Sequence, residues 1–173
     1  HAYAPKVRDY SEEFQALYHE TVYPIFRERE YIWGTYVWNM FDFSSEIRNE
    51  GGVRYKNCKG LVTYDRKIKK DAFYYYKAQW SDEPFVKIAE SRFVNREREK
   101  ITVKVYSNQP SVSITVNGAS YTVDSNTGVF CFENVRLQPG ENKIIASAGA
   151  WTDQGMFLGV SEKDESYIFV DQN

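Results

Sequence analysis

The pattern of apolar residues changes near position 80, and this change divides the chain into two different parts. Before Trp80 the apolar residues follow helical spacing or form one long run, whereas after it they alternate in short segments separated by turn residues. The two parts together have 173 residues, whereas an eight-stranded α/β barrel alone needs roughly 250. A whole barrel is therefore excluded, and we expect a boundary near 81–84, with domains at 1–82 and 83–173.

The first part indicates an α/β arrangement. Apolar residues three and four positions apart predict a helix over 9–30, which Pro24 should end or kink near its last turns. The continuous apolar run Tyr31–Phe43 predicts a strand buried on both faces, and the polar stretch 44–60 predicts a long loop after it. A second helix is predicted over 71–80. This order of elements is that of an α/β fold.

The second part predicts a β-sandwich. Alternation of apolar and polar residues has the period of a strand, as in 101–106. Asn117-Gly118 predicts a tight hairpin turn, and Pro139-Gly140 predicts another bend. Trp151 and Met156 lie in a Gly-rich stretch that is interpreted either as packing or as a carbohydrate-binding edge. About seven short strands fit an immunoglobulin-like sandwich, and they are expected at 85–89, 101–106, 112–116, 121–123, 129–132, 142–148 and 167–170.

Charge, hydropathy and cysteine content exclude several classes of partner. The 22 basic and 24 acidic residues leave a net charge of -2, which does not favour nucleic acid, and the basic run 66–70 is interpreted as a solvated turn. No apolar run is long enough to cross a membrane. Cys58 and Cys131 form no zinc or disulfide pattern, and His1 and His19 are too far apart for a metal pair. No metal and no cofactor is expected.

Aromatic and polar residues meet at the end of the predicted buried strand, in Trp38 and Asp42. Barrel enzymes hold their sites at the carboxyl ends of their strands. An aromatic ring there can stack on the C–H face of a sugar, while polar side chains hydrogen-bond its hydroxyl groups. Alternatively, Trp38 belongs to the core and Asp42 caps a loop. The residues alone leave both readings open.

Three segments carry a family resemblance. Residues 36–43, 57–66 and 70–80 resemble the end of the catalytic barrel of glycoside hydrolase family 2, which contains β-galactosidases, β-glucuronidases and β-mannosidases. Residues 103–118 and 132–146 further resemble the β-sandwich that follows the barrel in many bacterial β-galactosidases. The resemblance implies the C-terminal portion of a TIM (β/α)8 barrel followed by an immunoglobulin-like sandwich.

The resemblance also implies a mechanism. Family members retain the anomeric configuration with two Glu residues about 5 to 5.5 Å apart, one an acid/base and one a nucleophile. Both precede the matched segments in the family, so neither is expected in this chain. Asn49-Glu50 has the acid/base sequence but lies in the wrong loop, where Glu50 is instead a candidate ion-pair partner of Arg48. The remaining candidates are expected to be surface carboxylates of the first helix: Glu12, Glu13 and Glu20.

The residues implied to bind substrate are Trp38, Asn57, Lys59 and Asp42. Trp38 matches the platform beneath the sugar at the cleavage subsite. Asn57 and Lys59 match an Asn-x-Lys motif that grips the sugar carboxylate in family β-glucuronidases, although the same spacing occurs in related β-galactosidases. Asp42 either contacts the sugar or orients Trp38 or the loop.

The leading functional expectation is the C-terminal fragment of a β-galactosidase that hydrolyses terminal β-D-galactose and is inactive alone. Alternatives are a β-glucuronidase of the same family and a non-catalytic carbohydrate-binding module. Expected partners are a β-galactoside and the rest of a longer parent, because the sequence opens at His1 without a leader-like stretch. Rings such as Trp33, Tyr75 and Tyr76 would be exposed without that parent, so self-association is also expected. Polysaccharide-degrading family members are often exported, which favours placement outside the cytoplasm.

Overall fold

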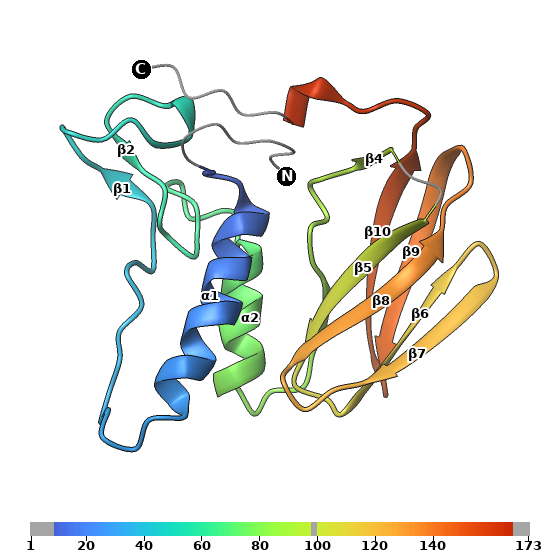
Figure 1. Ribbon diagram of the computed structural model, residues 1–173, viewed down its shortest axis with the longest axis horizontal. Helices are drawn as coiled ribbons and strands as arrows, with labels where there is room; N and C mark the ends of the chain where they lie inside the picture. Colours follow the sequence, from blue (N-terminus) through green and yellow to red (C-terminus); the bar gives the residue numbers. More distant parts are fainter. Residues whose placement is uncertain (1–8, 98–99, 168–173) are drawn as a thin grey trace. The chain divides into compact units, whose positions relative to one another are not determined.

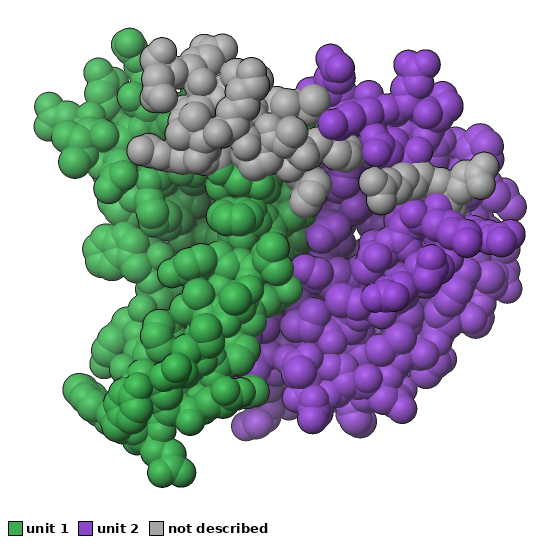
Figure 2. Space-filling view, viewed as in Figure 1, with its two compact units in different colours: residues 1–73, 167–173 green, residues 74–166 purple. Residues whose placement is uncertain are grey.

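The computed structural model describes residues 9–97 and 100–167, and these form two compact units. The first unit comprises 9–73 with Tyr167, and the second comprises the described part of 74–166 (Figure 1, Figure 2). This division falls inside the second predicted helix, and the domain limits proposed from the sequence stay a prediction. Among the described residues, no helix has both the length and the hydropathy that crossing a lipid bilayer requires.

Helix α1 spans Glu12–Arg27 and confirms the centre of the first predicted helix. Ser11 begins it, because its side-chain oxygen accepts the backbone N–H of Phe14 at 3.2 Å and satisfies one of the free N–H groups of the first turn. Pro24 lies inside the helix and lacks an N–H group, and the helix ends within one turn of it.

Residues 31–42 do not form the buried strand that their composition predicts. In the described part of the chain their bridge pairing is limited to Phe41 beside Val62, and Trp33 and Tyr36 are more than nine-tenths exposed. A strand buried on both faces needs hydrogen-bonding neighbours along its length. The apolar composition predicts a preference for burial, but it cannot supply these neighbours, and this prediction is wrong for the structure described.

Short pairings give structure to the predicted loop 44–60. Strand β1 (Phe43–Ser44) pairs antiparallel with β2 (Lys56–Asn57), and one turn of 3-10 helix, η1 (Glu50–Gly52), lies between them. Helix α2 then spans Asp71–Trp80, the range that its apolar spacing predicts.

The strands of the second unit form a two-sheet sandwich, which confirms an all-β second part (Figure 1). The five-stranded sheet has the order β4-β10-β9-β6-β7, and the three-stranded sheet has the order β3-β5-β8. The apolar core contains side chains from both sheets, such as Phe130 from the three-stranded sheet and Phe157 from the five-stranded sheet. The bounds are β3 Val86–Ile88, β4 Asn95–Arg96, β5 Lys100–Ser107, β6 Ser111–Val116, β7 Ala119–Asp124, β8 Val129–Arg136, β9 Gly140–Ala148 and β10 Trp151–Gly159.

The hairpin turn predicted at Asn117-Gly118 is confirmed. Both residues have positive φ, 52° and 82°, as a two-residue type I′ turn requires, and they join β6 to β7. Strand β10 was not predicted, because most of its residues are at least partly exposed and its apolar residues do not alternate regularly. Of the strand predicted at 167–170, Tyr167 ends the 3-10 helix η2 (Glu165–Tyr167), and 168–170, like His1, lie outside the described residues.

The expected exposure of unpartnered rings is confirmed for Trp33 but wrong for Tyr75 and Tyr76, which are both buried. Within the second unit, the Tyr75 ring meets the Tyr106 ring edge-on at 6.1 Å, and the Tyr76 ring lies 4.3 Å from that of Trp80. The sequence could not indicate these contacts, because β5 supplies Tyr106 from a distant part of the chain.

Candidate functional site

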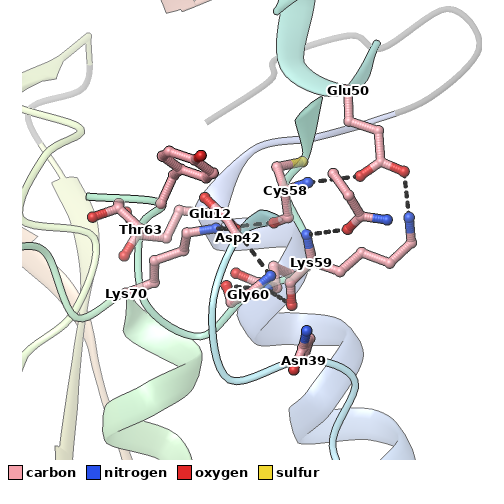
Figure 3. A network of polar contacts seen from close by, with 12 residues as sticks. Glu12, Asn39, Asp42, Glu50, Cys58, Lys59, Gly60, Thr63 and Lys70 are labelled. Atoms are coloured by element: carbon pink, nitrogen blue, oxygen red, sulfur yellow. Dashed lines mark hydrogen bonds and ion pairs between the residues drawn. The ribbon is translucent and has the colours of Figure 1, made fainter. Parts of the chain in front are cut away.

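Two segments of the first unit, 38–44 and 56–62, lie side by side. Together they carry all four predicted substrate-binding residues, of which Figure 3 labels Asp42 and Lys59. Where the segments run parallel, Leu61 donates its N–H to the carbonyl of Asn39 at 2.9 Å, and Val62 donates to Met40 at 3.0 Å. Further along, Phe43 faces Asn57 in the antiparallel β1–β2 pair. Backbone pairing therefore holds these residues together independently of any ligand.

Gly60 makes this pairing possible. A Cβ at this position would lie 2.0 Å from the backbone nitrogen of Asp42 and 2.2 Å from the carbonyl carbon of Phe41. Its own N–H donates to Oδ1 of Asp42 at 2.9 Å. Only a residue without a side chain allows the two backbones to approach this closely.

Trp38 presents a large aromatic surface to solvent. Its side chain is 67% exposed, and its ring meets that of Phe43 edge-on at 5.9 Å. The peptide bond between Trp38 and Asn39 is cis. An exposed indole held by a neighbouring ring is the kind of surface on which the apolar face of a sugar can stack.

Asn57 and Lys59 form a compact turn. The side-chain oxygen of Asn57 accepts the backbone N–H of Lys59 at 3.0 Å, while its amide nitrogen has no partner in the described part of the chain. Asn57 is buried, whereas the side chain of Lys59 is 47% exposed. The turn therefore offers a free amide donor and an accessible ammonium group.

Glu50 stabilises this turn, and Figure 3 shows its carboxylate between Cys58 and Lys59. One oxygen accepts the backbone N–H of Cys58 at 2.8 Å, and the other forms an ion pair with the Lys59 ammonium. The predicted pairing with Arg48 is wrong, because the two carboxylate oxygens contact Cys58 and Lys59 instead. Although burial opposes ionisation of Glu50, the Lys59 ammonium and the Cys58 N–H outweigh it and lower the pKa of this carboxyl.

The same surroundings make Cys58 a poor nucleophile. Burial, and then the negative charge of Glu50, raise the pKa of the Cys58 thiol to about 11. A thiol with this pKa is almost fully protonated at neutral pH, and its sulfur is a weak nucleophile and a weak metal ligand. Within 9–97 and 100–167, no group of three His, Cys, Asp or Glu residues could hold a metal ion.

Asp42 is only 1% exposed and uses its carboxylate within the protein. Beside the Gly60 bond, Oδ1 accepts from the Lys70 ammonium at 2.7 Å, and Oδ2 lies 3.7 Å from that of Lys56. Lys70 also donates to the carbonyl of Cys58 at 2.9 Å. Of the two roles offered for Asp42, these contacts match the orientation of the loop.

The basic run 66–70 is only partly the solvated turn that was expected. Lys67 and Lys69 are exposed, but the side chain of Lys70 is mostly buried in its pair with Asp42, and the Arg66 guanidinium lies 4.1 Å from the Phe41 ring. Sequence reasoning missed both Lys70 and Glu50 as parts of the site. No local signal distinguishes a lysine that faces solvent from one that pairs with a carboxylate 28 positions away.

The carboxylates of α1 also differ from their expected exposure. Glu13 is buried rather than on the surface, and Oε1 of Glu12 accepts the backbone N–H of Asp71 at 2.5 Å. Glu20 is partly exposed.

The sandwich offers no row of exposed rings in the part of the chain that the structure describes. Strands β6 and β7 instead carry hydroxyl pairs on their outer face, such as Ser113 with Thr122 at 2.8 Å. Trp151 and Met156 are partly exposed at separate positions of β10. Aromatic stacking on a sheet face, which a carbohydrate-binding module would use, has little support in this arrangement.

Comparisons with known proteins agree on one family. A family model described as a domain of unknown function (DUF4982) matches residues 98–150. A β-glucuronidase of Bacteroides fragilis is 43% identical over 137 residues, which cover 77% of this chain and 20% of that enzyme. A β-galactosidase of Bacteroides ovatus is 28% identical over 131 residues, covering 74% of this chain and 15% of that enzyme.

A solved structure matches almost the whole chain. An FMN-binding β-glucuronidase from Faecalibacterium prausnitzii L2-6 superposes with a TM-score of 0.90 at 44% identity, covering 98% of this chain and 26% of that one. The chain thus spans about a fifth of the length of the curated Bacteroides fragilis enzyme. Since DUF4982 is a C-terminal region of such enzymes, the chain belongs to glycoside hydrolase family 2.

Proposed function

We propose that this chain is the C-terminal part of a retaining glycoside hydrolase that cleaves terminal β-glucuronides. Lys59 and Asn57 bind the carboxylate of the sugar, and Trp38 lies beneath its ring. Asp42 orients the loop that carries Lys59 and does not contact the sugar. The observation that carries this proposal is the accessible Lys59 ammonium, fixed beside the free amide nitrogen of Asn57.

The choice of a glucuronide over a galactoside has two supports. The Bacteroides fragilis and Faecalibacterium prausnitzii relatives, at 43% and 44% identity, are both named β-glucuronidases, whereas the Bacteroides ovatus β-galactosidase is 28% identical. In addition, an ammonium group forms charge-assisted hydrogen bonds with a carboxylate, which a glucuronide has and a galactoside lacks. We therefore propose a β-glucuronide as the substrate, in place of the β-galactoside expected from the sequence.

We also propose that residues 1–82 complete a catalytic barrel and that 83–173 form an immunoglobulin-like domain. Support comes from 33–38, whose backbone N–H groups have no hydrogen-bond partner among the described residues. An extended apolar segment with unpaired N–H groups has the properties of a strand without its neighbours. Helix α1 supports the same view, because several of its large apolar side chains are exposed: Phe14, Leu17, Tyr18, Ile25 and Phe26.

In this proposal the chain supplies binding rather than proton transfer or nucleophilic attack. The acid/base Glu and the nucleophile Glu lie on the rest of the enzyme, and the chain positions the sugar against them. The 173-residue chain alone is expected to be inactive on aryl β-glucuronides.

The test compares 4-nitrophenyl β-glucuronide with 4-nitrophenyl β-galactoside in the full-length enzyme. Wild type should prefer the glucuronide, and Lys59→Ala should lower kcat/KM for the glucuronide by roughly a hundredfold while leaving galactoside turnover unchanged. Trp38→Ala should lower turnover of both substrates. Lys67→Ala, at a lysine 80% exposed, is the matched control and should change neither.

Two outcomes contradict the proposal. A wild-type enzyme that cleaves the galactoside and rejects the glucuronide refutes the substrate. Equal losses on both substrates in Lys59→Ala refute the role of the ammonium group.

A further inference from the structure

Glu50 is a buried carboxylate whose two oxygens both serve the Asn-x-Lys turn. One accepts the N–H of Cys58, and the other pairs with the ammonium of Lys59 (Figure 3). Its side chain is 3% exposed, so Glu50 itself is not accessible to a sugar. The lysine of the pair is partly accessible, because nearly half of the Lys59 side chain remains exposed.

We propose that Glu50 is a positioning residue that determines selectivity for acidic sugars by orienting the Lys59 ammonium. The inference rests on the function proposed above and adds to it a residue that does not contact substrate. An ammonium group has three donors, and the pair with Glu50 occupies one. The other two remain for the carboxylate of a sugar.

Orientation matters at this position because a lysine side chain is long and flexible. Its four-carbon stem loses substantial rotamer entropy when the ammonium is held in one place. Glu50 restricts the stem before substrate binds, so less of this entropy is lost on binding. The Cys58 bond fixes the carboxylate in turn, and the turn and its lysine are therefore held by a single buried group.

Glutamine at position 50 is the sharpest perturbation, because it has almost the same shape as glutamate. An amide has one acceptor oxygen and one donor nitrogen, whereas Cys58 and Lys59 both need an acceptor. Glu50→Gln therefore leaves the Cys58 N–H or the Lys59 ammonium without its partner. Glu50→Asp keeps both oxygens on a shorter side chain and serves as a second variant if Glu50→Gln folds poorly.

The experiment is a double-mutant cycle in the full-length enzyme, with Glu50→Gln, Lys59→Ala and the double variant. Glu50→Gln should raise KM for 4-nitrophenyl β-glucuronide about tenfold with little change in kcat, and it should leave galactoside turnover unchanged. In the Lys59→Ala background it should have no further effect, because it acts through the lysine. Glu50→Asp should restore part of the lost KM. Glu83→Gln, at the exposed end of a lysine pair, is the matched control.

A loss that is equal on both substrates, or that persists in the Lys59→Ala background, overturns the proposal and makes Glu50 a purely structural residue. A lower KM in Glu50→Gln also overturns it, because Glu50 would then compete with the sugar carboxylate. Acylation of Lys59 by acetic anhydride, measured by mass spectrometry, separates this inference from the proposed substrate. Faster acylation in Glu50→Gln supports positioning even in an enzyme that rejects glucuronides, and an unchanged rate refutes it.

Discussion

Gly60→Ala should disrupt the site by forcing apart the two backbone segments that carry it. The added carbon would lie 2.0 Å from the backbone nitrogen of Asp42, where ordinary contact begins at 3.4 Å. The two segments must therefore separate by more than an ångström. Neither backbone can yield alone, because both belong to the pairing that joins 38–44 to 56–62.

The expected cost follows from the hydrogen bonds at this crossing. Three bonds of 2.9 Å are at risk: Gly60 N–H to Oδ1 of Asp42, Leu61 N–H to the Asn39 carbonyl, and Asp42 N–H to the Val62 carbonyl. Each contributes about 1 kcal/mol, and overpacking adds about 1 to 3 kcal/mol. We expect Gly60→Ala to lower the free energy of unfolding by about 4 to 6 kcal/mol.

Urea unfolding followed by circular dichroism measures this change. Gly34→Ala is the matched control, because a Cβ there meets nothing within 4 Å and its φ is not in the left-handed region. Gly34→Ala should change the free energy of unfolding by less than about 0.5 kcal/mol. If the free energies of unfolding of Gly60→Ala and Gly34→Ala differ by less than about 1 kcal/mol, which is about the cost of one hydrogen bond, the close approach does not constrain the fold and the reasoning is wrong.

Three further changes test the polar contacts behind the site. Asp42→Asn should lower the free energy of unfolding in urea by about 3 kcal/mol, because it leaves the buried Lys70 ammonium without its partner. Adding Lys70→Met should recover part of this loss. A double variant as unstable as the sum of the single ones contradicts this. Iodoacetamide at pH 8 should label the exposed Cys131 well before Cys58, whose pKa of about 11 leaves little thiolate; equal rates would refute the raised value. The lowered pKa of Glu50 stabilises the fold above the ordinary value of 4.5, and this contribution is lost as pH falls through the folded-state pKa. In that pH range, the free energy of unfolding of wild type should therefore decrease more steeply than that of Glu50→Gln. Parallel curves of unfolding free energy against pH would contradict this expectation.

Local signals in the sequence predicted local structure well. Helix α2 has the range that its apolar spacing predicts, and Asn117-Gly118 forms the turn that its residue types favour. In each case the atoms that decide the structure lie within a few residues of one another. The run Tyr31–Phe43 failed as a predicted strand for the opposite reason. A strand is defined by partners distant in sequence, and the apolar composition carries no information about which partners are present.

The four predicted site residues differ in role, and the sequence does not indicate how. The family motif selects Trp38, Asn57, Lys59 and Asp42 together, but a motif does not say which side chains meet a ligand. Exposure separates three of them, because Trp38 and Lys59 reach solvent, whereas Asp42 is enclosed and bonded to Gly60 and Lys70. Asn57 is buried like Asp42, but its amide nitrogen has no partner among the described residues. A variant at Asp42 should consequently act on the ligand only through the loop, with a loss of stability, while Lys59→Ala removes a side chain that itself reaches the ligand. Glu50, outside the motif, belongs with Asp42 in this division, since both are buried carboxylates that hold the segment 58–60 from behind.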